Sequence, residues 1–584
     1  MAKAYGIDLG TTYSVIATLG KNGTPEVIDN YDDDSQTLAS AVYFEPTGEI
    51  VVGESAKSEA EAHPDCVVQF VKREIGRDDA IVRHFEGFEG MEFDPITISS
   101  LILKRMKEYV EEQGNDEVKN VVITCPAAFN MAQREATKQA GIMAGFNVLD
   151  VINEPTAAAL NYCCREFGED RKILVYDLGG GTFDATLIDY SLDEDEKATV
   201  KTIDSMGDSM LGGIDWDARL YDYICEVYCD ETAQNLSDVE DEIRPTVMRQ
   251  VEGIKKQLSK KATYNFNISS SNGVDRIEVS ADEFKARTED LVEKTINFVQ
   301  ALLNKNNMTP DDVDIVLLVG GSTKMPMIKE AVEAMFPGDK KVRVEKPDLA
   351  VAMGAALKSA MKVVEIFETQ QKIKEEEAKG ITSSAGADSD DFESQISLVE
   401  KEKSKAIDLG ISAEEIAVLS TQVPENVKGV EDILSRSFGP AVLKDNALMI
   451  NNLLFVGDAP GENTATYYTP HANLPSLRIP VYENVSKDAF LTPSEDLYGN
   501  PQATDPDLLV NKLGEVILPL SDGTPEGAPI EVFFHCSEAG LDVRVKDIRS
   551  GVVQPATFQS SFIKSEEELE EGKAAVNMLK MRSN

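Results

Sequence analysis

Several residue types that mark specialised protein classes are scarce in this chain of 584 residues. It has one tryptophan, four histidines and seven cysteines, and these cysteines and histidines lack the spacing of zinc ligands. We expect free, buried or partly buried thiols, without a zinc site or a histidine-based triad. No apolar run is long enough to span a membrane, and Asp8 interrupts the first apolar stretch, where a secretion signal would be uninterrupted. These absences favour a cytoplasmic protein without a membrane partner.

Positive charge is also in short supply. Lysine and arginine number 57 against 103 aspartates and glutamates, which gives a formal net charge of -46. Binding to a nucleic-acid backbone needs clustered basic residues, so nucleic acid is not an expected partner. The hydrophobic fraction of 42% is that of ordinary globular protein, and the length predicts several domains.

The most informative stretch is DLGGGTFD at residues 177–184, which lies between two apolar runs. Two apolar runs around a glycine-rich turn predict a β-hairpin. Three successive glycines can bring bare backbone N–H groups together as a nest for phosphate oxygens. Asp177 and Asp184 could hold a hydrated divalent cation at the ends of the turn, and Thr182 adds a hydroxyl group. An ordinary tight hairpin with surface carboxylates is the alternative interpretation.

A second copy of the pattern favours the phosphate interpretation. Residues 5–15 have the same order of apolar strand, Asp-Leu-Gly, small hydroxylated residues and apolar strand. Two such hairpins far apart in one chain predict two related subdomains that face each other across a cleft. Each hairpin would then bind one side of a polyphosphate.

Three further features are candidates for the same cleft. Lys72 could act as a point charge near a γ-phosphate, although on this segment alone a solvated lysine is the better explanation. Glu154 ends a predicted strand and could order a water molecule, or it could simply interact with the dipole of the following helix. Residues 247–260 predict a helix whose polar face could follow a purine and ribose or could face solvent. That face is formed by Glu252, Lys255, Lys256 and Ser259.

Strands alternate with helices through residue 366, which predicts an α/β fold. Residues 315–319 predict a buried strand that runs into Gly320 and Gly321, a pattern suited to close approach of the backbone to a ligand. An alanine-rich helix is expected over residues 351–366.

The motifs together resemble one known family, the heat-shock 70 chaperones of the DnaK type. The resemblance rests on GIDLGTTYS (6–14), VKREIGR (71–77), INEPTAAAL (152–160), DLGGGTFD (177–184), LVGGSTKMP (318–326) and KPDLAVAMGAA (346–356). It implies an actin-like two-lobed ATPase domain over residues 1–366, with ATP or ADP, Mg²⁺ and K⁺ in the cleft.

The resemblance also assigns roles to individual residues. Catalysis of ATP hydrolysis falls to Lys72, Glu154, Asp177 and Thr182, and the cation-site carboxylates are Asp8, Asp177 and Asp184. Phosphate contacts fall to Gly10, Thr11, Thr12, Tyr13, Gly179, Gly180, Gly181 and Thr182, and contacts to the rest of the nucleotide to Glu252, Lys255, Lys256, Ser259, Gly320, Gly321, Ser322, Lys324 and Asp348. Pro126 and Arg134 resemble a proline–arginine pair that carries a signal to the other domain.

The second half departs from the usual plan of the family. Residues 367–430 form an acidic, partly helical insertion or linker, with residues 430–434 as a diluted form of the family's short apolar linker. From residue 431 to residue 555, short alternating strands predict an antiparallel β-sandwich. That region resembles the family's peptide-binding domain, in which Leu477 and Ile479 would line the pocket or, alternatively, belong to the sandwich core. Residues 556–584 predict one acidic helix, a truncated lid that should allow fast peptide release.

The implied function is that of an ATP-dependent chaperone that binds extended apolar segments of unfolded proteins during folding and stress. By resemblance, its partners are a J-domain cochaperone and a nucleotide exchange factor. A nucleotide-binding scaffold, similar to an exchange factor and with negligible hydrolysis, is the main alternative. An actin-like filament or a sugar kinase is disfavoured by the β-rich second half.

Overall fold

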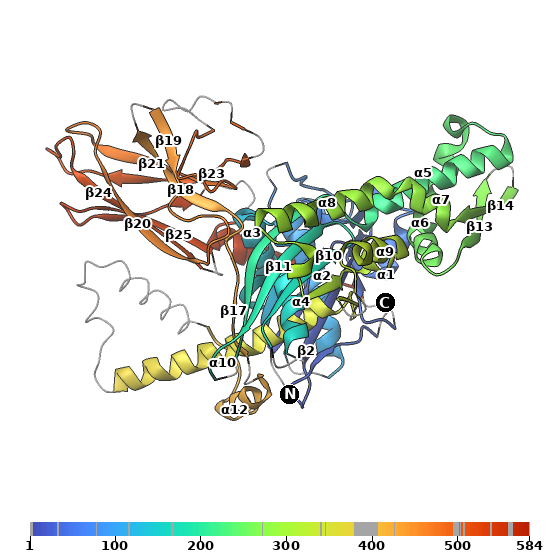
Figure 1. Ribbon diagram of the computed structural model, residues 1–584, viewed down its shortest axis with the longest axis horizontal. Coiled ribbons are helices and arrows are strands. Elements are labelled where there is room, and N and C mark those ends of the chain that lie inside the picture. The colour runs from blue at the N-terminus through green and yellow to red at the C-terminus, as the bar shows by residue number, and fades with distance from the viewer. Residues whose placement is uncertain are drawn as a thin grey trace.

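The computed structural model describes residues 4–582 with gaps, in three regions rich in secondary structure (Figure 1). The residues left out are 32–33, 78, 115–116, 165–168, 196, 271–272, 339–340, 345, 379–406, 425–426, 445–446, 495–501, 503, 506–507, 538–539 and 559–563. None of the described helices is both long and apolar enough to cross a lipid bilayer. All seven cysteines are free and at least partly buried, as predicted.

The first region is organised around a sheet of strand order β3-β2-β1-β8-β9, with β4 paired to β2. The strands are β1 (Ala4–Asp8), β2 (Tyr13–Leu19), β3 (Pro25–Val27), β4 (Leu38–Ala39), β8 (Asn120–Cys125) and β9 (Asn147–Asn153). Strands β1 and β2 form the predicted antiparallel hairpin, while β1, β8 and β9 pair in parallel. Parallel neighbours need helical crossovers, which α2 (Pro95–Glu112) and α3 (Met131–Met143) provide.

A smaller sheet of order β6-β5-β7 accompanies the first one. It consists of β5 (Ala41–Phe44), β6 (Ile50–Val52) and β7 (Val67–Gln69), with α1 (Glu54–Glu59) packed against it. A single 3₁₀ turn, η2 (Val71–Arg73), then carries the chain from β7 toward α2. From this turn Lys72 reaches Glu154, and Arg73 reaches Gly181 and Asp215.

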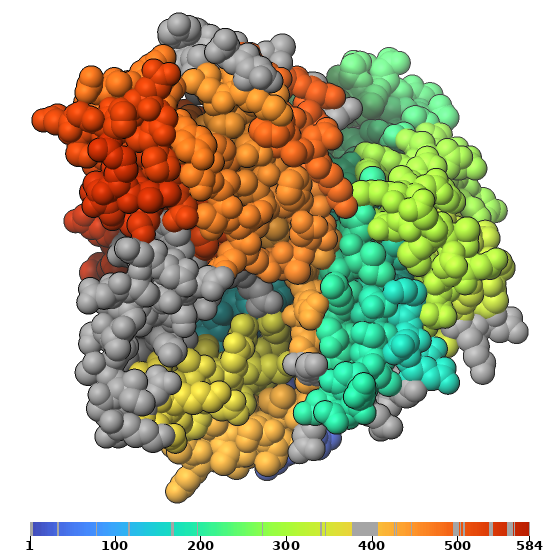
Figure 2. Space-filling view, turned by 60° about the vertical axis from the view of Figure 1, so that its left-hand side comes forward, coloured from blue at the N-terminus to red at the C-terminus, as the bar shows by residue number. Residues whose placement is uncertain are grey.

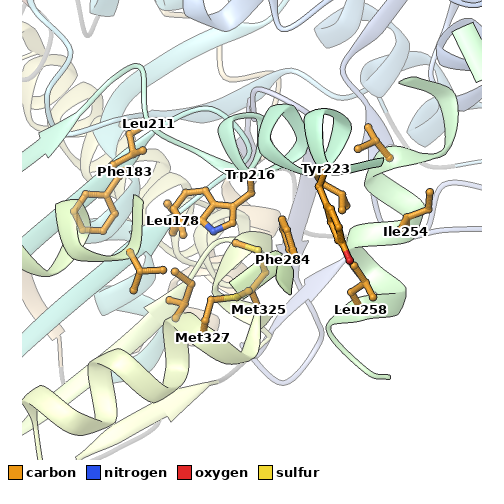
Figure 3. Close-up of a cluster of buried hydrophobic side chains, with 14 of the residues drawn as sticks. Leu178, Phe183, Leu211, Trp216, Tyr223, Ile254, Leu258, Phe284, Met325 and Met327 are labelled. Atoms are coloured by element: carbon orange, nitrogen blue, oxygen red, sulfur yellow. The ribbon is translucent and has the colours of Figure 1, made fainter. Parts of the chain in front are cut away.

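The second region repeats the hairpin in a sheet of order β16-β15-β10-β11-β12-β17. Its strands are β10 (Arg171–Leu178), β11 (Phe183–Leu192), β12 (Ala198–Asp208), β15 (Ile315–Val319), β16 (Val342–Val344) and β17 (Val427–Glu431). The helices of this region are α5 (Gly213–Thr232), α6 (Leu236–Leu258), α7 (Ala281–Arg287), α8 (Glu289–Lys305) and α9 (Pro326–Met335), with a hairpin of β13 (Thr263–Ser270) and β14 (Gly273–Ser280). A continuous apolar core lies between sheet and helices, and Trp216 is fully buried in it beside Met325 and Phe284 (Figure 3).

Two helices join the first and second regions. Both α4 (Glu154–Cys163) and α10 (Ala350–Ala378) contribute to a hydrophobic cluster that also takes side chains from both sheets. They cross so closely that a Cβ atom at Gly354 would lie 1.7 Å from the carbonyl oxygen of Ala157. The backbones of the two helices therefore fix the two regions relative to each other.

The third region holds two antiparallel sheets of order β22-β19-β18-β21-β23-β27 and β20-β24-β25-β26. The strands are β18 (Ser437–Lys444), β19 (Ala447–Asn451), β20 (Gly461–Tyr468), β21 (Ser476–Asn484), β22 (Phe490–Leu491), β23 (Asn511–Pro519), β24 (Pro529–Ser537), β25 (Gly540–Asp547), β26 (Val553–Pro555) and β27 (Thr557–Phe558). Both sheets supply one shared core, to which Val516 and Val532 belong. The period-2 pattern of apolar residues predicts this packing correctly.

The chain between the second and third regions binds to both of the earlier sheets. Helix α12 (Ala413–Gln422) packs on α10, and the preceding residue Asp408 pairs with Lys119 of the first region. Strand β17 then joins the edge of β12 in parallel. The space-filling view shows this segment running from α12 along the flank of the second sheet into the sandwich (Figure 2).

The C-terminal helix α13 (Glu566–Met578) lies on the first region, against α2 and α3. Val576 is fully buried there, and Lys104 donates hydrogen bonds to the carbonyl oxygens of Val576 (2.8 Å) and Leu579 (3.2 Å). After the helix, Met581 forms a parallel bridge with Ile50 of β6. The helix predicted as a short lid thus contacts the first region, where its apolar face packs on α2 and α3.

Three expectations about element bounds need revision. Helix α6 starts at Leu236 rather than near residue 247, because the apolar stripe continues through Val239 and Ile243 in spite of Pro245 within the helix. Helix α10 extends beyond residue 366 through Ala378, so it crosses the expected domain boundary. The acidic, partly helical segment expected over residues 367–430 lies partly outside the described residues, and α12 covers part of its second half.

We predict that Val576→Ala loosens the docking of α13. Removing two buried methyl groups costs about 2 kcal/mol of local stability. Hydrogen exchange of the full chain should therefore be faster by about tenfold or more in α13 and in the facing turns of α2 and α3. Met578→Ala is the control, because Met578 is 82% exposed at the end of the same helix. Equal exchange rates in the two variants would contradict the docking seen here.

Candidate functional site

The turns of the two hairpins face each other. A Cβ atom at Gly180 would lie 2.1 Å from the hydroxyl oxygen of Thr12, and one at Gly181 would lie 2.6 Å from the methyl group of Thr11. Side chains at these glycines would therefore collide with the opposite turn. The structure thus brings together the two turns that the sequence predicts to lie on either side of a cleft, one from each sheet.

Carboxylates surround this meeting point. Asp8 ends β1, Glu154 begins α4, and Asp177 and Asp184 are opposite each other in the β10–β11 register. Lys72 contributes the local positive charge through a hydrogen-bonded ion pair with Glu154, and both of these side chains are buried. The negative charges outnumber the positive charge of Lys72 in a site largely closed to water.

The excess of negative charge shifts the pKa values of the buried aspartates. Burial and the charge of Glu154 raise the pKa of Asp8 to about 7 and that of Asp184 to about 7, although Lys72 opposes the shift. Burial, Glu154 and Asp184 also raise the pKa of Asp177. Burial disfavours the charged form of Lys72, but the negative charges of Glu154 and Asp8 outweigh this effect. The pKa of Lys72 is therefore raised, and its ammonium group stays charged. An added cation would relieve the repulsion among the carboxylates.

A second cluster closes the cleft on the side of α6. Lys57 of α1 pairs with Glu252 of α6 and donates a hydrogen bond of 2.8 Å to the hydroxyl oxygen of Tyr13. Lys256 lies 5.0 Å from the centre of the Tyr13 ring and also pairs with Glu252. Burial opposes ionisation of Glu252, but Lys57 and Lys256 outweigh it and lower the pKa of Glu252 to about 2. This cluster is a charged bridge between the two regions.

The loop after β15 completes the floor of the cleft. Gly320 has φ of 83° and passes so close to the hairpin that a Cβ atom would lie 2.3 Å from the carbonyl oxygen of Leu178. Only glycine fits that conformation and approach. Ser322 donates a hydrogen bond of 2.8 Å to the carbonyl oxygen of Gly179, and Lys324 pairs with Asp348.

Most of the predicted site residues therefore converge, with some exceptions. Ser259 ends α6, and its hydroxyl group donates to the carbonyl oxygen of Lys255 in its own helix. Lys255 reaches the start of α5, where it binds Asp217 and the carbonyl oxygen of Gly213 at 2.8 Å each. Leu477 and Ile479 lie on β21 in the third region and pack into the sandwich core, Leu477 only partly buried.

Three residues of the site carried no predicted role. Lys57, Arg73 and Asp217 each bind a predicted residue, as ion-pair or hydrogen-bond partners of Glu252, Gly181 and Lys255. Arg73 has a weak sequence signal, its position next to Lys72, whereas Lys57 and Asp217 stand in ordinary helical sequence. Pro126 follows the end of β8, directly before Ala127 and Ala128, whose backbone interacts with Asp184 of the site. Arg134 lies in α3 and contacts the carbonyl oxygen of Val151 at 3.2 Å.

Comparison with known proteins identifies the family. The model of the family described as Hsp70 protein matches residues 4–377. The chain belongs to the Hsp70 family. Proteins named chaperone protein DnaK from Thermosipho melanesiensis and Thermotoga petrophila are each 38% identical to it, over 362 and 363 residues respectively. Each match covers 61% of this chain and 59% of the relative, so the chain aligns with less than two thirds of these Hsp70 relatives.

The family match ends within α10, so it includes both facing turns and the carboxylate cluster of this Hsp70 chain. It also includes Lys57, Arg73 and Asp217. The insertion, the sandwich and α13 come after the matched residues, and their roles depend on the structure of this chain.

We predict that Asp184→Asn stabilises the nucleotide-free protein more at pH 8 than at pH 5. A carboxyl group with a raised pKa holds a proton in the folded state that the unfolded chain releases, so it lowers stability as the pH rises from about 4 to about 7. The amide removes this loss, which is about 4 kcal/mol for a pKa raised by about three units. The fluorescence of the sole tryptophan, Trp216, reports urea unfolding of the region that holds Asp184.

Asp65→Asn serves as the control, since Asp65 is an exposed carboxylate in the short turn before β7. Its stability difference from the wild type should stay constant between the two pH values. A constant difference for Asp184→Asn as well would show that the carboxylate cluster carries no net repulsion.

Proposed function

We propose that this chain is an ATP-dependent molecular chaperone that hydrolyses ATP to ADP and phosphate and uses the nucleotide state to control its affinity for unfolded polypeptides. The observation that supports this most strongly is the pair of facing glycine-rich turns with buried carboxylates and Lys72 between them. Membership of the Hsp70 family agrees with it. In this proposal the first and second regions are the two lobes of an actin-like ATPase domain.

The residues present fit a divalent cation. Asp8, Asp177 and Asp184 offer hard oxygen ligands in a site with excess negative charge, and one carboxylate oxygen of Asp184 is buried without a hydrogen-bond partner. Within the described parts of the chain, no three acidic, histidine or cysteine side chains converge closely enough to hold a metal by themselves. Mg²⁺ would therefore bind through water and phosphate oxygens, as it commonly does, and K⁺ would add positive charge beside it. When bound, Mg²⁺ supplies charge neutralisation at the phosphates.

The chain's own residues position the reactants. The turns Gly10 to Tyr13 and Gly179 to Thr182 bind phosphate oxygens from opposite sides through their backbone N–H groups. The N–H groups of Gly10 and Gly179 instead donate to the Ser14 hydroxyl group (3.2 Å) and the Thr182 carbonyl oxygen (3.0 Å), which shapes the turns. Glu154 orients a water molecule for in-line attack on the γ-phosphorus, and the bond to the bridging oxygen of ADP breaks as the new P–O bond forms. Lys72 stabilises the charge that develops on the phosphoryl oxygens. The nucleoside end of ATP is held by the Lys57–Glu252–Tyr13 bridge and by Lys255, Ser259, Gly320, Gly321, Ser322, Lys324 and Asp348.

The third region would bind peptide as an extended strand, through backbone hydrogen bonds and a side-chain pocket. Leu477 and Ile479 are the candidates for that pocket, and the partial exposure of Leu477 makes it the better placed of the two. Unfolded proteins, a J-domain cochaperone and a nucleotide exchange factor are the proposed partners, in the cytoplasm.

We predict that Lys72→Ala lowers steady-state ATP turnover by a factor on the order of 100, with ATP binding retained. Lys72 acts on charge that develops at the γ-phosphate during the reaction, so its loss affects turnover more than binding. Lys172→Ala is the control, because Lys172 also forms an ion pair with a carboxylate, Asp189, but does so near the surface at the far end of the β10–β11 hairpin. Undiminished turnover in the Lys72 variant would contradict the proposed mechanism.

We also predict that ATP accelerates release of a fluorescent apolar peptide from the full chain, compared with ADP. Binding sites that share a conformational equilibrium must affect each other's affinity reciprocally. Tight ATP binding with no turnover and no effect on release would instead favour a nucleotide-binding scaffold.

A further inference from the structure

Hydrogen bonds to its three glycine carbonyl oxygens hold the second glycine-rich turn, residues 179–182, in place. The carbonyl oxygen of Gly179 accepts from the backbone N–H of Gly213 (3.0 Å) and from the hydroxyl group of Ser322 (2.8 Å). The carbonyl oxygen of Gly180 accepts from the backbone N–H of Ile214 at 2.9 Å. These anchors all belong to the same region as the turn itself.

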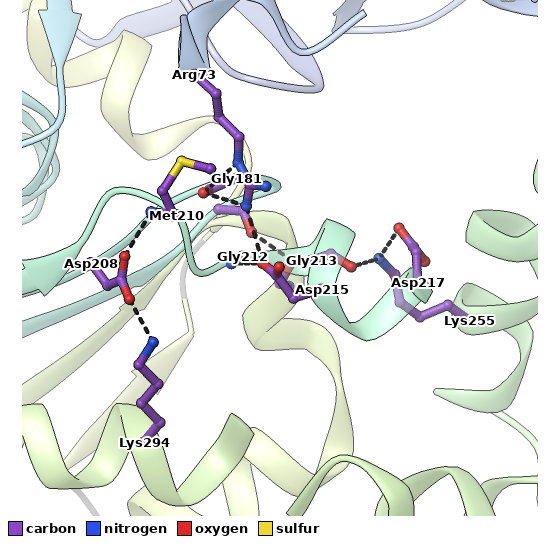
Figure 4. Close-up of polar contacts among 12 residues, drawn as sticks. Arg73, Gly181, Asp208, Met210, Gly212, Gly213, Asp215, Asp217, Lys255 and Lys294 are labelled. Atoms are coloured by element: carbon purple, nitrogen blue, oxygen red, sulfur yellow. Dashed lines mark hydrogen bonds and ion pairs between the residues drawn. The ribbon is translucent and has the colours of Figure 1, made fainter. Parts of the chain in front are cut away.

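The third carbonyl oxygen of the turn, that of Gly181, is anchored from the other region. Arg73 donates two hydrogen bonds to it, from Nε at 3.0 Å and from Nη2 at 2.8 Å. Figure 4 shows this guanidinium group reaching down from the first region to Gly181 and Asp215. Arg73 lies on η2, directly after Lys72, whereas the turn lies on the β10–β11 hairpin.

Asp215 gives the arginine a second, charged contact. Its carboxylate accepts from Nη2 of Arg73 at 3.0 Å and from the backbone N–H of Gly212 at 2.7 Å. Gly212 caps α5, and a Cβ atom there would lie 2.5 Å from the backbone nitrogen of Gly181. Arg73 therefore ties together the turn and the start of α5.

The direction of the carbonyl groups determines the direction of the N–H groups. In a planar trans peptide the C=O and N–H bonds point in opposite directions. The N–H groups of Gly180 and Gly181 therefore point away from the start of α5, and the N–H group of Thr182 points away from Arg73. The peptide between Gly181 and Thr182 depends on Arg73 for this orientation.

We propose that Arg73 is a positioning residue that presents the Thr182 N–H group to the γ-phosphate of ATP when the two regions are closed. The inference rests on the proposed ATPase function. One short 3₁₀ turn carries both residues, so that Lys72 enters the cleft while Arg73 reaches the carbonyl oxygen of Gly181 in the opposite loop. Closure therefore aligns the lysine charge and the loop N–H groups in a single movement. Hydrolysis thereby depends on closure through a residue outside the phosphate contacts themselves.

The test compares Arg73→Met, Arg73→Lys and the control Arg83→Met in the full chain. Methionine keeps the length of the side chain and removes all donors, whereas lysine keeps the charge but cannot form the two-pronged contact. Arg83 is a suitable control because it forms a comparably buried, two-pronged contact with Glu74 at 3.0 and 2.8 Å, away from the turn.

Single-turnover and steady-state kinetics should show kcat for ATP reduced by about 10- to 100-fold in Arg73→Met, in the range found for residues that orient catalytic groups. The Kd for ADP, which lacks the γ-phosphate, should change by less than about threefold, and Arg73→Lys should recover part of the loss. Arg83→Met should retain wild-type kcat. Equal weakening of ATP and ADP binding in Arg73→Met, with unchanged kcat, would show that Arg73 supports nucleotide binding in general. That result would overturn the proposal.

A second measurement does not depend on nucleotide. In the nucleotide-free protein, hydrogen exchange of residues 179–182 should be faster in Arg73→Met than in the wild type or Arg83→Met, because one of the three carbonyl anchors is gone. If the wild type fails to hydrolyse ATP while this exchange difference is present, the proposed function fails and the anchoring role stands. Unchanged exchange at residues 179–182 would overturn the anchoring itself.

Discussion

The structure depends on an unfavourable charge arrangement placed where two sheets meet. Asp8, Asp177, Asp184 and Glu154 gather around a single ammonium group, that of Lys72, in surroundings that exclude most water. Alone, such a cluster lowers stability, and the raised pKa values of Asp8 and Asp184 record that cost. The same repulsion among carboxylates favours the binding of a cation at this place. The surrounding fold has to keep these groups together.

The fold does this from several directions at once. Helices α4 and α10 pack closely between the sheets, while charged bridges cross the cleft at Lys57–Glu252 and at Arg73–Asp215. Strand β17 extends the second sheet toward the sandwich, and the carboxylate of Asp432 just after it accepts from the hydroxyl groups of Thr202 (3.0 Å) and Thr156 (3.3 Å). The third region is thereby attached next to the start of α4, the helix that begins with Glu154.

The C-terminal segment attaches the third region at a second place. Helix α13 packs on α2 and α3, and Met581 pairs with β6, so the same segment touches elements on both sides of the turn that holds Lys72 and Arg73. The sandwich is thus connected to the second sheet through β17 and to the first region through α13. Any movement between the first two regions also changes the distance between these attachments.

The sequence alone determined the local elements and the chemistry of the site, because these depend on short-range patterns. Alternating and apolar runs around glycine turns predicted both hairpins and the sandwich strands, and the glycine-rich pattern with its flanking aspartates predicted the two facing turns. The roles of Lys72 and Asp8 came from the resemblance to the family. Tertiary structure alone decided which partners these elements have. The position of α13, the pairing of β17 and the contacts of Lys57, Arg73 and Asp217 join residues distant in sequence, and amphipathic helices or charged side chains can satisfy themselves against many surfaces. Only the packing of the whole chain selects among those surfaces.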